Sequence, residues 1–130
     1  MSIKKGNDLF LNGCLMQKPY IVKNTKPVQE RAYQLITSYV IPEDGVYDII
    51  SYMDVSVDDS KMYINAIFIN SDDSITKYKE STVIRSTMHG GGGSIAYMIT
   101  SLEKGDSVKV FAYTAVSCNA TARLTVARRF

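Results

Sequence analysis

One stretch of the sequence decides the fold class: residues 42–57, PEDGVYDIISYMDVSV. It opens with Pro42 and Gly45 on either side of an acidic pair, which is the pattern of a type I β-turn. After the turn, apolar and polar side chains alternate with a period of two, as expected for a half-buried strand. One face would carry Tyr47, Ile49, Ser51, Met53, Val55 and Val57. The other would carry Asp48, Tyr52, Asp54 and Ser56.

Alternating segments separated by short turns lie on both sides of this strand. Towards the N-terminus we expect a short strand at 20–22 and an extended segment at 33–41, although 28–36 also fits one helical turn. Towards the C-terminus we expect strands at 62–69, one or two edge strands within 74–87, then 95–102, 108–116 and 121–129. Gly105 would take the positive φ of a tight hairpin turn at 103–106. About eight to ten strands at this spacing predict an all-β, antiparallel jelly-roll sandwich.

Composition and charge narrow the function classes. The 130 residues predict one domain, with residues 1–30 as an irregular N-terminal tether and 31–130 as the head. Fifteen Lys and Arg against thirteen Asp and Glu give a charge of +2, so no overall attraction to nucleic acid is expected. Basic residues near the C-terminus are therefore expected to form salt bridges or partner contacts. No apolar stretch approaches the length of about 18 residues that would insert into a membrane.

The N-terminus and the cysteines indicate where the protein is made. Residues 1–8 contain lysines but no apolar segment follows, so the sequence predicts synthesis in a cytoplasm without a signal peptide. Cys14 and Cys118 lack the CxxC spacing of zinc and redox sites, and two free thiols are expected.

No enzyme is predicted, and no catalytic residue is assigned. A nucleophile–His site would have to use His89, the only histidine, which precedes the glycine run 90–93. Catalysis needs its base held rigidly within hydrogen-bond reach. The glycine run is also a poor phosphate-binding loop, since it precedes a strand and no Lys follows it. A flexible or closely packed β-loop is the favoured interpretation.

Loops at the ends of the sandwich are the candidate ligand sites, because exposed loops usually carry binding residues. The candidates lie in 58–60, 70–73 and 88–93, with these residues singled out: Asp58, Asp59, Asp72, Asp73 and His89. The aspartates together with Asp54 are oxygen donors of the kind that calcium prefers. Solvated turns are the favoured interpretation, so no metal or other cofactor is predicted, and calcium is the one ion that these residues would suit.

The aromatic residues point to an interface. Tyr97 would share a strand face with Ile95 and Ile99, while Phe111 and Tyr113 would lie opposite the aliphatic face of their own strand. An antiparallel sandwich that stays monomeric normally keeps one face polar. Apolar residues on both faces indicate that a second surface is covered, although tyrosines scattered over the surface are the alternative. Tyr97, Phe111 and Tyr113 are therefore candidate contacts of a homotrimer.

Several motifs, in order, resemble the trimeric jelly roll shared by tumour necrosis factor and the globular heads of complement and collagen-like proteins. Residues 40–49 resemble the family's P-x-x-G-x-Y-x-F entry to a central strand, and 64–70 its next long strand. Residues 102–110 resemble its L-x-x-G-D-x-V-x-V hairpin, and 122–130 take the place of its closing strand. The resemblance covers about residues 20–130 and implies a homotrimer around a threefold axis, without the receptor signalling of the cytokines.

A head of this kind without a signal peptide is similar to heads on bacteriophage fibres and baseplates. The resemblance thus implies a trimeric structural or receptor-binding head of a fibre, a baseplate or a capsid decoration. Its partners would be other copies of itself, other virion proteins and a host-surface glycan. Its location would be the virion, outside the cell after assembly. A carbohydrate-binding module of the same fold on a bacterial cell or spore surface is the alternative.

Overall fold

The computed structural model describes residues 2–5, 8–11, 14–16, 18–56, 62–71, 78–89 and 93–130, and the side chains of 18–56, 62–69, 87 and 93–130. Eleven strands and no helix occur in these ranges. None of them therefore contains a helix long and apolar enough to cross a membrane.

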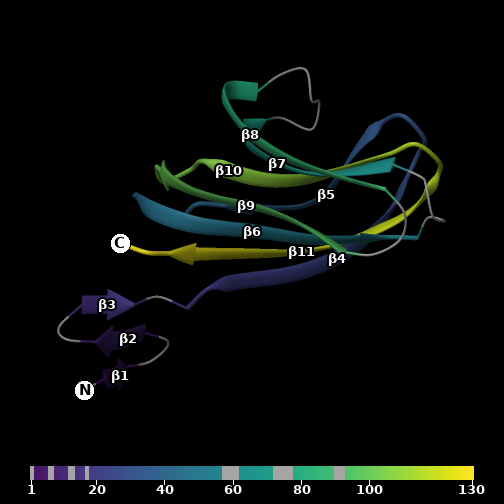
Figure 1. Cartoon of the computed structure of the whole chain (residues 1–130). Coiled ribbons are helices and arrows are strands. Elements are labelled where there is room, and N and C mark those ends of the chain that lie inside the picture. The colour runs from purple at the N-terminus through teal and green to yellow at the C-terminus, as the bar shows by residue number, and fades with distance from the viewer. Residues whose placement is uncertain are drawn as a thin grey trace.

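Eight strands build a jelly-roll sandwich of two four-stranded antiparallel sheets (Figure 1). The first, here the β5 sheet, has the order β5 (Tyr33–Val40), β10 (Ser107–Thr114), β7 (Met62–Ser71) and β8 (Tyr78–His89). The second, the β4 sheet, has the order β4 (Tyr20–Val28), β11 (Cys118–Arg128), β6 (Gly45–Val55) and β9 (Gly93–Leu102). The predicted fold class is confirmed, including the extended conformation of 33–40 and an edge position for β8.

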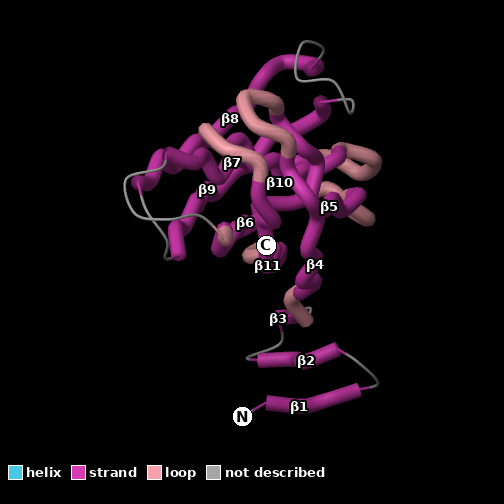
Figure 2. The backbone as a smooth tube through the Cα atoms, turned by 90° about the vertical axis from the view of Figure 1, so that its right-hand side faces the viewer, coloured by secondary structure: helices cyan, strands magenta, loops and turns pink. Residues whose placement is uncertain are grey.

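Part of the N-terminal segment 1–30, which the sequence sets apart from the head, belongs to the sandwich. Its strands β1 (Ser2–Lys5), β2 (Asp8–Leu11) and β3 (Cys14–Met16) form a separate three-stranded sheet, which lies below the sandwich in Figures 1 and 2. β4, however, pairs with β11 along nine residues, from Tyr20 to Val28. The boundary of the sandwich therefore falls before Tyr20 and not after residue 30. Alternation was hard to detect in β4 because its side chains are mostly exposed.

The main core lies between the two sheets and follows the period-two pattern of the strands. In β6, every second residue from Tyr47 to Val55 is buried, as the opening stretch predicts. Both sheets contribute fully buried side chains, among them Ile49 and Leu124 from the β4 sheet and Ile67 from the β5 sheet. At about 1.5–3 kcal/mol for each large apolar side chain, this burial is the main force that holds the sheets together.

A buried polar contact joins the sheets inside this core. Asn65 of β7 is completely buried, and its amide oxygen accepts a 2.8 Å hydrogen bond from the Ser51 hydroxyl of β6. The Asn65 amide nitrogen donates to the carbonyl oxygens of Ser51 at 2.7 Å and Ser94 at 3.3 Å. These bonds satisfy both ends of the amide, so a polar residue is tolerated at this depth.

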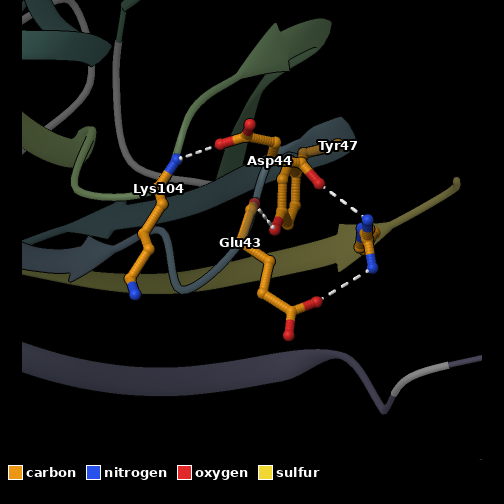
Figure 3. Close-up of polar contacts among 5 residues, drawn as sticks. Glu43, Asp44, Tyr47 and Lys104 are labelled. Carbon is orange, nitrogen blue, oxygen red and sulfur yellow. Dashed lines mark hydrogen bonds and ion pairs between the residues drawn. The ribbon is translucent and has the colours of Figure 1, made fainter.

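One end of the sandwich is fastened by the chain reversal at residues 41–44. Figure 3 shows the Tyr47 hydroxyl donating to the Glu43 carbonyl oxygen at 2.6 Å, and the Lys104 backbone nitrogen donating to Asp44 at 2.8 Å. Arg128 adds a 3.1 Å ion pair to the Glu43 carboxylate and a 2.7 Å bond to the Asp44 carbonyl oxygen. The expected salt-bridging role of the C-terminal basic residues is confirmed at Arg128.

The turn between β9 and β10 adjoins the same reversal. It is not the predicted hairpin turn, because β9 and β10 belong to different sheets and do not pair. Gly105 has a φ of 94°, the left-handed conformation that the sequence predicts for it. The Asp106 backbone nitrogen donates to Glu103 at 3.0 Å, and the backbones of Gly105 and Ile41 bond at 2.8 Å. The two turns therefore support each other.

Candidate functional site

The outer face of the β4 sheet, which points away from the core, gathers most of the large exposed apolar side chains. These are Ile21 on β4, Tyr52 on β6, and Ile95, Tyr97 and Ile99 on β9. The register places Tyr97 beside Ile50, Ile50 beside Thr125, and Thr125 beside Ile21, so one row of side chains crosses all four strands. Unlike most solvated sheet faces, this one is not mainly polar.

The residues Ile95, Tyr97 and Ile99 form what we call the β9 stripe. Their exposed fractions are 61%, 47% and 47%, while Ala96 and Met98 between them are buried. Strict alternation along β9 thus sends one set of apolar side chains into the core and the other into solvent. The expectation that this strand is apolar on both faces is confirmed.

A polar network lies beside the stripe. The Tyr97 hydroxyl donates a 2.9 Å hydrogen bond to one Asp48 oxygen, and the Arg129 Nε lies 3.3 Å from the other. The bond to Asp48 raises the pKa of Tyr97 above its ordinary value. Both Asp48 oxygens have a partner, so this acidic group fits next to an apolar surface.

A depression of about 470 Å³, here the outer pocket, opens on the same face towards the β4 edge. Its lining comes from three adjacent strands: Lys23 and Thr25, Tyr52 and Asp54, and Thr121 and Arg123. The register explains this grouping, because two neighbouring cross-strand rows supply all six residues.

The charges in the outer pocket are not neutralised within the described part of the chain. Arg123 of β11 lies directly opposite Lys23 of β4, and both are exposed. No ion pair or hydrogen bond of either side chain, or of Asp54, occurs among the described residues. The Thr25 and Thr121 hydroxyls bond each other at 2.7 Å in the next row.

Gly93 sets the position of the Tyr52 ring. A Cβ atom at Gly93 would collide with the hydroxyl and ring carbons of Tyr52, so the ring lies tightly over the glycine backbone. Tyr52 borders both the outer pocket and the β9 stripe, since it faces Arg123 on one side and Ile95 on the other. The favoured interpretation of the glycine run as a closely packed segment holds at Gly93, whereas 90–92 lie outside the described residues.

The loop residues predicted from the sequence are not tested. Asp58, Asp59, Asp72 and Asp73 lie outside the described residues, and His89 is described only through its backbone. The register does place their flanking strand ends: His89 pairs with Met62 at the start of β7, and Tyr78 pairs with Ser71 at its end. These ends are about 30 Å apart along the strand, so residues 58–60 and 88–93 adjoin one end of β7 and residues 70–73 adjoin the other.

The three predicted interface residues have different surroundings. Tyr97 is exposed on the β9 stripe, and Tyr113 is half-buried. The expectation that Phe111 offers an exposed apolar surface needs correction, because Phe111 is completely buried within the single chain. It packs with Phe68, at 5.0 Å between ring centroids, in a second cluster that Tyr33 and Tyr113 extend. Side chains from the flanking strands β5 and β7 surround Phe111, so no second copy is required to bury it.

Sequence reasoning overlooked Lys23, Thr25 and Thr121 as site residues. They come from the first and last strands of the sandwich, nearly a hundred positions apart, and only the β4–β11 register brings them together. The one available signal was period-two spacing of polar residues in two strands of unknown pairing.

Among the described residues, no group of three or more His, Cys, Asp or Glu converges as a metal site. Cys118 is a half-buried free thiol, and the side chain of Cys14 is not described.

Comparisons with solved structures agree with the fold. The globular domain of zebrafish complement 1qA protein matches with a TM-score of 0.58 and 11% identity, over 86% of this chain and 97% of that domain. A chain from the structure of infectious bursal disease virus, Gx strain, matches with a TM-score of 0.53 and 11% identity. That match covers 98% of this chain but 38% of the viral chain. No family model and no curated protein matches the sequence.

The comparisons confirm one part of the expected resemblance. The chain has the jelly-roll fold of a complement globular domain, which is one of the heads that the sequence motifs resemble. At 11% identity the likeness is one of fold alone. Neither comparison indicates an enzyme.

Proposed function

We propose that this protein is a non-enzymatic, trimeric head of a bacteriophage virion appendage that adheres to a host surface. The observation that carries the proposal is the β9 stripe, with three large apolar side chains about half exposed in one line. A contiguous apolar surface of this kind usually marks an interface. Three copies that meet through the β9 edge of this face would remove the stripe from water.

The fold supports this assignment in two ways. A complement globular domain and a chain from a virus structure have the same architecture, and this chain covers nearly the whole of the former. The N-terminal sheet lies outside the sandwich, where it could attach the head to another virion protein (Figure 2). A host-surface glycan is the proposed ligand, and the virion is the proposed location.

Sedimentation velocity at micromolar concentration tests the assembly. The expected species has three times the chain mass of 14.5 kDa. A compact monomer would contradict the proposal, because it would mean that the β9 stripe stays in water. Genome neighbourhood tests the biological setting: tail or capsid genes beside this one are expected. Neighbouring genes for cell-wall or spore-coat proteins would instead favour the carbohydrate-binding module of a bacterial surface.

A further inference from the structure

The outer pocket contains an unfavourable charge arrangement that the described part of the chain does not resolve. Lys23 and Arg123 are direct cross-strand partners, which places their Cα atoms about 5 Å apart. Like charges in such positions destabilise a sheet, and neither side chain forms an ion pair with the described residues. An anion between them would turn this repulsion into two charge-assisted contacts.

The second cross-strand row of the pocket restricts the chemical class of that anion. Asp54 lies opposite Thr121 and diagonally from Arg123, and as a carboxylate it only accepts hydrogen bonds. A compact inorganic anion would be repelled by Asp54, whereas a hydroxyl group would donate to it. Thr25 and Thr121 add two further hydroxyls beside this acceptor. The ligand therefore carries negative charge at one end and hydroxyl groups at the other.

Tyr52 and the size of the pocket supply the remaining constraint. The Tyr52 side chain is 41% exposed and is held over Gly93, so it offers a fixed apolar surface beside the cations. The volume of about 470 Å³ lies within the range of small-ligand sites, roughly 300–1,000 Å³. A sugar ring has both the apolar C–H groups and the hydroxyls that this lining requires.

We infer that the outer pocket binds an acidic saccharide, with its carboxylate between Lys23 and Arg123 and its hydroxyls at Asp54 and the two threonines. This inference names a ligand class for the proposed adhesive role and rests on that role. The six residues come from one chain, so the site is complete in a single copy. The β9 stripe occupies the opposite edge of the sheet, which leaves Lys23 and Arg123 outside the stripe itself.

The test compares matched pairs of ligands on the full chain. Glucuronate and galacturonate are titrated against glucose and galactose, with sulfate as a simple anion, and binding is followed by NMR shifts of the Thr121 amide and by melting temperature. The uronates should bind and raise the melting temperature as their concentration increases, while the neutral sugars and sulfate should bind at least tenfold more weakly. Equal binding of a neutral sugar, or of sulfate, would overturn the assignment.

Arg123→Gln and Lys23→Gln should each weaken uronate binding at least tenfold. Without ligand they should fold as well as the wild type, because they remove a like-charge contact. Lys26→Gln is the control: Lys26 is exposed on the same strand but alternates onto the other face. Unchanged binding in Arg123→Gln would overturn the inference. So would dissociation of assembled protein by uronate, which would mean that a carboxylate of a second copy occupies the pocket.

The outcome is separable from that of the proposed function. A trimer that binds no uronate would remove the ligand assignment alone. A monomer that binds uronate would contradict the threefold assembly and leave the pocket assignment standing.

Discussion

Asn65 shows how one polar residue can be fixed in an apolar core. Its amide makes three hydrogen bonds to residues of the opposite sheet, and these satisfy both of its ends. We expect Asn65→Ala to lower the free energy of unfolding by about 2–3 kcal/mol, since the Ser51 hydroxyl would be left buried without its acceptor. Urea unfolding followed by circular dichroism measures the loss.

Asn24→Ala is the matched control for this variant. Asn24 donates one 2.9 Å bond to the Ile36 carbonyl oxygen at an exposed position. Its replacement should lower the free energy of unfolding by less than about 1 kcal/mol, because water can take the place of the lost donor. Equal losses for the two variants would contradict the role assigned to Asn65.

Tyr63 makes stability sensitive to alkaline pH. Burial raises the pKa of Tyr63 above its ordinary value of 10.0, and the Asp54 carboxylate raises it further. The folded chain therefore holds this proton more tightly than the unfolded chain. The resulting stabilisation is complete below about pH 10 and is lost as the pH rises through the folded-state pKa.

The measurement compares urea unfolding of wild type and Tyr63→Phe from neutral pH to about pH 11. Tyr63→Phe should lose less stability over the alkaline range than the wild type. Burial also raises the pKa of Tyr47, so the stability of the variant should still fall with rising pH, but by a smaller amount. If the free energies of unfolding of the two proteins fall in parallel as the pH rises, ionisation of Tyr63 does not destabilise the fold.

At the scale of the elements, the β9 stripe predicts where association fails. Tyr97→Asp places a carboxylate in the surface that the proposed trimer would bury, where an unpaired charge would strongly oppose association. The variant should sediment as a folded monomer. Val40→Asp is the control, because Val40 is 60% exposed on the other sheet. If Tyr97→Asp remains assembled with an unchanged melting temperature, the interface lies elsewhere.

Phe111→Asp should instead unfold the chain, because Phe111 belongs to its interior.

The strands show what a sequence can predict in this fold. Alternation in β6 and β9, and the glycine of the β9–β10 turn, are local signals, and they predicted strand positions and facing correctly. Whether an outward side chain meets water depends on the neighbouring strands. Phe111 and Tyr97 both lie opposite core-facing residues of their strands, yet Phe68 and Tyr33 cover the first and nothing described covers the second. The outer pocket was unpredictable for the same reason, since its pairing of Lys23 with Arg123 joins the two ends of the sandwich sequence.

At the scale of the whole molecule, the chain divides into a sandwich and a small N-terminal sheet. β1, β2 and β3 pair with one another, while β4 belongs fully to the sandwich. Both backbone views place the small sheet to one side of the other strands (Figures 1 and 2). Because these three short strands pair only with one another among the described strands, we expect them to contribute little to the stability of the larger unit.

Removal of residues 1–17 should therefore leave the melting temperature of the sandwich within about 2 °C of the full chain. It should also leave the proposed threefold assembly intact in sedimentation velocity, because the β9 stripe belongs to the retained part. Attachment to a larger particle should be lost if the small sheet is the tether. A control that removes residues 1–28 also deletes β4 and exposes the β11 edge, and it should fail to fold. A marked drop in melting temperature for the shorter deletion would instead make the small sheet part of the folding unit, and the tether would have to lie elsewhere.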